Sequence, residues 1–189
     1  MIGELDRFVR ALETGTRLHA GQVRKGTRVP YVSHLLGTCA IALEFGANED
    51  QAIAALLHDV IEDVEPVEAG RAAVRGFGPE VLRIVEACTD ADTHPKPPWR
   101  ERKIAYMDRL AHEDAAALLV SASDKLHNAR AIVADLRQHG PALWERFNPD
   151  SDQPWYYRGL VTAFRANPNH PVALVDELES TVAEMERLA

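Results

Sequence analysis

The sequence has 189 residues, of which 46% are hydrophobic and 26% are charged, and its formal net charge is −8. These values are typical of a globular domain with a sizeable hydrophobic core. The negative charge argues against broad nucleic-acid binding, and the apolar runs, such as 52–57 and 115–120, are too short to span a bilayer. Acidic residues near the N-terminus argue against a signal peptide. We therefore expect a cytoplasmic protein that binds neither nucleic acid nor a membrane.

Helical patterns with start and stop signals recur along the chain, whereas the alternation typical of strands is scarce. A first helix is expected over 34–46, where Gly46 is a natural terminator. The next is expected over 48–63, because Asn48 suits an N-cap and Gln51 suits its capping-box partner. Similar patterns predict further helices over 78–90, 97–113, 114–140, 153–167 and 170–189. The prediction is a single all-α domain over residues 1–189.

The sequence contains two cysteines, Cys39 and Cys88. Both lie in apolar helical segments, where a thiol behaves as a small hydrophobic side chain. We expect a buried, reduced pair rather than a disulfide or a metal site.

The strongest functional signal is the pair His58-Asp59 inside AIAALLHDVIED at 52–63. His34 lies upstream in one predicted helix, and Asp124 lies downstream in another. Imidazole and carboxylate ligands without a thiolate suit Mn²⁺, Fe²⁺ or Zn²⁺ better than a structural zinc cage. We predict that these four side chains converge on one divalent metal ion, in the HD arrangement used mainly to hydrolyse phosphate esters.

Two further acids, Glu62 and Asp63, follow this pair. On one helix Glu62 shares a face with His58, and Asp63 shares a face with Asp59. Such crowded carboxylates repel, so their pKa values are pushed apart unless a cation neutralises them. The alternative is a solvated acidic helix end, but it does not explain why the acids directly continue an apolar segment. One of the two acids is expected to accept a proton from an attacking water.

Several segments resemble the hydrolase domain of the RelA/SpoT alarmone enzymes, and especially its free-standing small alarmone hydrolases. The matching segments are AGQVRKGTRVPYVSHLLG (20–37), AALLHDVIED (54–63), SDKLHNAR (123–130) and, more loosely, PWYYRGLVTAF (154–164). The pattern RKGxxxPYxxH followed by HDxxED and DKLHN is specific, because a generic HD protein would share only the metal residues. The resemblance implies a stand-alone helical HD-domain hydrolase.

The resemblance also implies a role for each matched residue. Glu62 and Asp63 match the acidic pair that positions or deprotonates the attacking water. The positions that match the family's metal ligands, which usually bind Mn²⁺, are His34, His58, Asp59 and Asp124.

Four residues are implicated in substrate binding by the same resemblance. Arg24 matches a residue that stacks on the purine base, and a flat guanidinium is well suited to that contact. Lys25 follows it in the nucleotide pocket, and Asn128 matches a residue near the sugar. Lys103 is a candidate phosphate ligand through a weaker match. The other nearby cations are Arg28, Lys96, Arg100 and Arg102. Arg100 and Arg102 either bind the nucleotide or form a solvated helix face.

The family removes the 3′-diphosphate of guanosine tetra- or pentaphosphate (ppGpp or pppGpp), the alarmones of the stringent response, and releases pyrophosphate with GDP or GTP. The expected partner is thus a small-molecule nucleotide, while formation of a homo-oligomer is left open. Leu35 and Ala131 depart from residues common in the family, proline and threonine respectively, so the preferred nucleotide is also open. An adenine alarmone such as ppApp, another 3′-phosphorylated nucleotide, or a sensor without catalysis are the alternatives. The intact Glu62-Asp63 pair argues against the sensor.

Three further assignments have two readings at this stage. The aromatic cluster Trp155–Tyr157 is expected to pack in the core rather than to form a ligand platform. His19 and His127 are either outer hydrogen-bond partners of the metal ligands or ordinary helical residues. Lys125 either pairs with acids near the metal or contacts the substrate.

Overall fold

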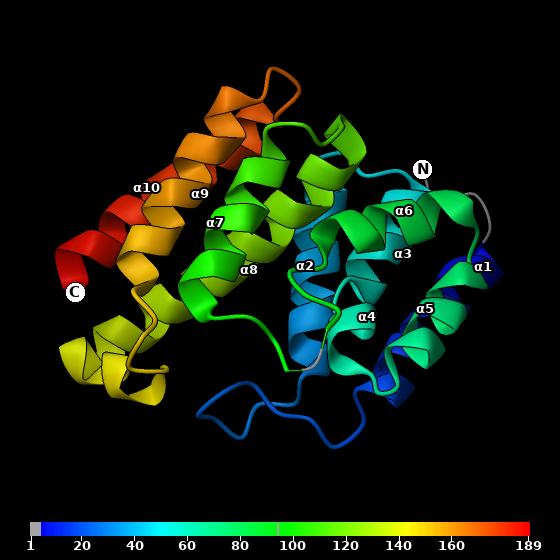
Figure 1. Cartoon of the computed structure of the whole chain (residues 1–189), viewed down its shortest axis with the longest axis horizontal. Coiled ribbons are helices and arrows are strands. Elements are labelled where there is room, and N and C mark those ends of the chain that lie inside the picture. The colour runs from blue at the N-terminus through cyan, green and yellow to red at the C-terminus, as the bar shows by residue number, and fades with distance from the viewer. Residues whose placement is uncertain (1–4, 94) are drawn as a thin grey trace.

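A computed structural model of the chain describes residues 5–93 and 95–189, and within these ranges the fold is all-α, as predicted. The first four residues of the N-terminal segment and His94 lie outside these ranges. Figure 1 shows a bundle of helices, in which residues 19–31 form a long connection. The helices are α1 (Leu5–Leu18), α2 (Val32–Glu44), α3 (Glu49–Leu57), α4 (Val60–Asp63), α5 (Val67–Arg75), α6 (Pro79–Cys88), α7 (Trp99–Leu110), α8 (Ala115–His139), the 3₁₀ helix η1 (Gly140–Arg146), α9 (Gln153–Ala166) and α10 (Val172–Leu188).

Helix α8 lies at the centre of the bundle. It packs against α2, α3 and α6 on one side and against α9 and α10 on the other (Figure 1). Every residue from Ala117 to Asp124 is buried, which is expected of a helix surrounded by others. Asp124 is therefore a carboxylate in the interior, where it needs partners of opposite charge.

Two of the predicted helix ends are confirmed. Helix α2 is followed by Gly46 at φ 89°, a backbone conformation that glycine adopts without strain. Helix α3 begins with the predicted capping box, in which Gln51 N donates to Asn48 Oδ1 and Asn48 N donates to Gln51 Oε1. The sequence patterns did not single out α1, α5 or η1 as helices.

The expected continuous helix over 48–63 is wrong at one point, because the chain turns at His58 and Asp59 between α3 and α4. His58 Nδ1 lies 2.9 Å from Ala55 O, the acceptor that the Asp59 N–H would use in a continuous helix. The two side chains of this turn lie close together, with Asp59 Oδ2 2.9 Å from His58 Nε2.

The cysteines, the C-terminal helix and the hydrophobicity of the helices complete the description of the fold. Cys39 and Cys88 are buried free thiols, as predicted. Helix α10 packs on α8, buries side chains such as Leu178, and forms exposed ion pairs of Arg130 with Glu177 and of Arg137 with Glu184. No helix within the described ranges is long and apolar enough to cross a membrane.

The capping box of α3 predicts a measurable loss of stability. Replacing Asn48 by Ala removes the acceptor for Gln51 N, so the free energy of unfolding should fall by about 1 kcal/mol in urea titrations. Asn48→Asp retains an acceptor and should stay close to wild type. Equal stability of the Ala and Asp variants would contradict the role of the cap.

Candidate metal centre

The four predicted metal-binding side chains come together from three parts of the chain. His34 comes from the first turn of α2, His58 and Asp59 from the turn before α4, and Asp124 from the middle of α8. The two Nε2 atoms are 3.1 Å apart. Asp59 Oδ2 lies 2.9 Å from His58 Nε2 and 3.4 Å from His34 Nε2. Asp124 Oδ1 lies 3.1 Å from His34 Nε2 and 3.6 Å from His58 Nε2.

Opposite charges within the cluster stabilise one another. Burial disfavours the charged form of His58, but Asp59 and Asp124 outweigh it and raise the pKa of His58 well above its ordinary value. Burial likewise opposes ionisation of Asp59, but the imidazoles of His58 and His34 hold the pKa of Asp59 well below its ordinary range. The cluster therefore favours ionised carboxylates next to a positive charge.

The donor atoms fit a divalent cation. His58 Nδ1 lies 2.9 Å from Ala55 O, and since a carbonyl only accepts, this nitrogen carries the proton. In the neutral imidazole the Nε2 lone pair is then free, as a metal ligand requires. The Nε2 atoms of His34 and His58 and the Oδ2 of Asp59 are close enough together to share one ion. Imidazole and carboxylate donors without sulfur favour Mn²⁺, Fe²⁺ or Zn²⁺.

Neighbouring side chains fix the orientation of the two carboxylates. Tyr31 Oη donates to Asp59 Oδ2 at 2.6 Å, and Lys125 Nζ donates to Asp124 Oδ2 at 2.5 Å. Asn128 Nδ2 donates to Asp124 Oδ1 at 2.6 Å. Lys125 thus pairs with an acid of the cluster. The sequence analysis did not predict a role for Tyr31. Its position three residues before His34, within a matched segment, could have indicated one.

His19 lies one layer further from the cluster. Its ring stacks on Tyr31 with 4.9 Å between ring centroids, and its Nδ1 contacts Gln22 Oε1 at 2.7 Å. His19 therefore supports the residue that holds Asp59 and contacts no predicted ligand in the interactions described.

Glu62 and Asp63 lie on α4, next to the cluster. Glu62 Oε1 accepts from Lys96 Nζ at 2.7 Å, and its Oε2 faces Asp90 N at 3.4 Å. Burial, together with the charges of Asp59 and Glu62, raises the pKa of Asp63 to about 7. Lys96 is therefore a partner of Glu62 rather than a solvated charge.

A cavity of about 560 Å³ lies beside the cluster, a size typical of sites for small ligands. Four residues of its wall, Tyr31, Lys125, His127 and Asn128, each hydrogen-bond one of the predicted metal ligands. The four residues predicted to bind substrate, Arg24, Lys25, Lys103 and Asn128, also line it. Aromatic side chains complete the wall, namely Trp99, Phe147, Tyr156 and Tyr157.

The cations that line this cavity already have partners in the protein. Arg24 Nη2 donates to Asn128 Oδ1 at 2.5 Å, so Asn128 joins Arg24 to Asp124. Lys25 is exposed, with its Nζ 5.7 Å from the Phe147 ring centroid. Lys103 Nζ donates to the partly buried Asp90 at 2.7 Å.

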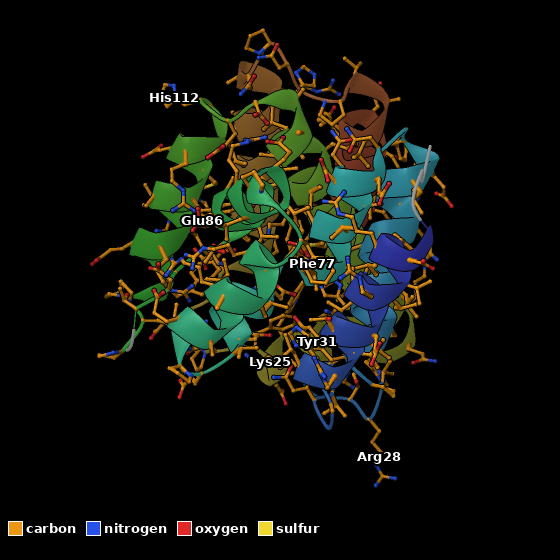
Figure 2. The ribbon with its side chains drawn as sticks, turned by 90° about the vertical axis from the view of Figure 1, so that its right-hand side faces the viewer. Lys25, Arg28, Tyr31, Phe77, Glu86 and His112 are labelled. Atoms are coloured by element: carbon orange, nitrogen blue, oxygen red, sulfur yellow. The ribbon has the colours of Figure 1, made fainter. Side chains whose placement is uncertain are left out.

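The other cations noted in the sequence do not line the cavity. Arg28 extends into solvent, away from Tyr31 and Lys25, in Figure 2. Arg100 lies over the Trp155 ring at 4.0 Å, and Arg102 pairs with Asp90. Arg100 is nevertheless exposed, whereas Arg102 is partly buried.

The aromatic cluster Trp155–Tyr157 packs largely as expected, and part of it borders the cavity. Tyr156 and Tyr157 are buried in the core, as expected, but both also line the cavity. Trp155 instead packs against Trp99 and Arg100.

A helical bundle with paired histidines and aspartates at its centre is the architecture of the HD domain, and the HD domain family matches residues 11–148. The chain belongs to this family, on the branch of the small alarmone hydrolases, which confirms the resemblance found in its sequence. The guanosine-3′,5′-bis(diphosphate) 3′-pyrophosphohydrolase MESH1 of Xenopus tropicalis is 38% identical over 133 residues, covering 67% of each chain. Human MESH1 is 32% identical over 162 residues, covering 82% of this chain and 83% of the relative.

A solved structure is similar over almost the whole length. It is that of a metazoan ortholog of SpoT, described as hydrolysing ppGpp and playing a role in starvation responses. The TM-score is 0.74 at 28% identity, and the match covers 99% of this chain and 97% of that one.

The raised pKa of Asp63 predicts a pH dependence of stability in the metal-free protein. Because the folded state holds the Asp63 proton more tightly than the unfolded chain, the stabilisation is present near pH 4 and is lost as the pH rises to about 7. Asn at position 63 cannot ionise. From pH 4 to 7 the free energy of unfolding of wild type should therefore fall relative to that of Asp63→Asn. Urea titrations in EDTA from pH 4 to 8 measure the difference, with Asp108→Asn on the exposed side of α7 as the control. Parallel profiles for wild type and Asp63→Asn would rule out the shift.

Proposed function

We propose that this protein is a Mn²⁺-dependent hydrolase that removes the 3′-diphosphate of ppGpp or pppGpp, with GDP or GTP and pyrophosphate as products. The observation that carries the proposal is the cluster of His34, His58, Asp59 and Asp124 beside a cavity lined with cations and aromatic rings. The MESH1 relatives are named for this reaction, and they support the choice of substrate. Zn²⁺ or Fe²⁺ would suit the same ligands.

The metal ligands in this proposal are the four clustered side chains. A divalent ion held by them would supply activation of a water molecule and polarisation of a phosphoryl oxygen. Tyr31, Lys125 and Asn128 restrict the rotation of Asp59 and Asp124, so the ligands are oriented before the ion binds.

The Glu62-Asp63 pair acts as the proton acceptor. The water oxygen attacks the phosphorus attached to the 3′ oxygen, the bond from that phosphorus to the 3′ oxygen breaks, and the 3′ oxygen takes up a proton. Asp63, with a pKa raised to about 7 in the metal-free protein, is suited to exchange protons near neutral pH. Lys96 holds the Glu62 carboxylate in place beside it.

The cavity binds the nucleotide. We assign the base to the side of Arg24, where the guanidinium lies near Tyr31 and is held by Asn128. Lys103 binds a phosphate group, with Lys25 at the exposed edge of the cavity. We assign the sugar contact to Asn128, which hydrogen-bonds both Arg24 and Asp124.

We also assign the whole chain to one functional domain. The family match ends at residue 148, yet Gln153, Tyr156 and Tyr157 of α9 line the cavity. Residues beyond the match therefore contribute to the same site.

The reaction can be tested with purified protein stripped of metal by EDTA. Incubation with ppGpp should release pyrophosphate and GDP only after Mn²⁺ is added back, as measured by anion-exchange chromatography of the products. A parallel incubation with ppApp reports the base preference, and faster turnover of ppApp would replace the guanine assignment. Nucleotide binding without release of pyrophosphate in any metal would reject the enzyme in favour of a sensor.

Two substitutions separate metal binding from proton transfer. Asp124→Ala should lose both bound metal, measured by elemental analysis, and turnover. Glu62→Gln should retain metal but lower kcat by about 10²- to 10⁴-fold. Glu68→Gln, on the exposed face of α5, is the matched control and should behave as wild type. Full activity of Glu62→Gln would remove that residue from the mechanism.

A further inference from the structure

His127 contacts the cluster from the side opposite to the ligand atoms. Its Nδ1 lies 2.9 Å from the Nδ1 of His34, whereas the Nε2 of His34 faces Asp59, Asp124 and His58. The hydroxyl of Thr38 is further from the same His34 nitrogen, at 3.5 Å. His127 is thus the nearer of the two hydrogen-bond partners described at the back of the His34 ring.

We propose that His127 is a positioning residue that fixes the tautomer and the ring orientation of His34, and that Gly37 provides the space for it. This inference rests on the proposed function, because it assumes that His34 is a metal ligand. A neutral imidazole that offers its Nε2 lone pair to an ion must carry its proton on Nδ1. That Nδ1–H then needs an acceptor, and Nδ1 of His127 is in place to accept it.

The packing of the His127 ring explains the glycine at position 37. His34 and Gly37 are three residues apart on α2, so they lie on the same face of the helix. A Cβ atom added at Gly37 would lie 2.1 Å from Cδ2 and 2.2 Å from Nε2 of His127, which is far closer than atoms can approach. Glycine costs about 1 kcal/mol of helix propensity relative to alanine, so the ring contact gives a reason for its presence in α2.

The contact of His127 with the cluster differs from that of the other three neighbours. Tyr31, Lys125 and Asn128 contact carboxylates, whereas His127 contacts an imidazole. Loss of such a partner from a histidine ligand lowers metal affinity by about 10- to 100-fold in other proteins. The expected defect of a His127 variant is therefore in binding of the ion, with a smaller effect on stability of the metal-free fold.

Two substitutions of equal shape test the hydrogen bond. Asn places its Oδ1 close to the position of the histidine Nδ1 and can accept from His34, whereas Leu has the same shape and no acceptor. We expect His127→Leu to weaken Mn²⁺ binding by about 10- to 100-fold and His127→Asn to stay within a few-fold of wild type. Isothermal titration calorimetry of the EDTA-stripped proteins with Mn²⁺ measures both. Circular dichroism and thermal melts of the metal-free proteins show whether each variant is folded.

Substitution of Gly37 provides a second, independent test. Gly37→Ala should reproduce the weaker Mn²⁺ binding by displacing the His127 ring, although alanine favours the helix. Combined with His127→Leu it should add little, because the two changes act through the same contact. His112→Leu, at the opposite end of the molecule from Tyr31 in Figure 2, is the matched histidine control and should bind Mn²⁺ as wild type does.

The possible outcomes separate this inference from the function that it rests on. Tight binding by wild type and His127→Asn with weak binding by His127→Leu supports the positioning role. Equal Mn²⁺ affinity of wild type and His127→Leu, or an equal loss in the Leu and Asn variants, overturns it and leaves the proposed metal site intact. Absence of divalent-ion binding by wild type overturns the proposed function as well.

Discussion

The two carboxylates of Asp59 and Asp124 lie against the imidazoles of His34 and His58 inside a helix bundle, and the rest of the site depends on this pairing. Transferring charged groups out of water costs several kcal/mol for each ion unless opposite charges and hydrogen bonds compensate. The protein compensates with the two imidazoles, with Lys125, and with donors from Tyr31 and Asn128. The same compensation leaves the ligand atoms facing one another, ready for a cation.

Two of the four clustered side chains come from a short interruption of regular helix. His58 and Asp59 lie in the turn between α3 and α4, and Asp59 Oδ2 lies 2.9 Å from His58 Nε2. In the same turn His58 Nδ1 contacts Ala55 O, and this contact assigns the ring proton to Nδ1. The hydrogen bond from His58 to Ala55 thus orients the His58 ring and leaves its Nε2 lone pair available in the neutral imidazole.

The neighbouring cavity shares its wall with the cluster. Tyr31, Lys125, His127 and Asn128 each line the cavity and contact a predicted ligand, so a molecule bound there meets the side chains that orient the metal site. In the proposed function, substrate binding and metal binding would therefore share these four residues.

The sequence by itself determined the all-α class, the capping box at Asn48 and the family, because helix periodicity, end signals and short motifs are local properties. It also supplied the predicted ligands, whose roles as ligands stay a prediction. Only the tertiary structure decided the turn at His58, the pairing of Lys125 with Asp124 and the contact of His127 with His34. Such contacts join helices that are far apart along the chain, and they depend on how α2 and α8 pack together. A motif names the side chains, whereas packing decides which atoms of those side chains meet.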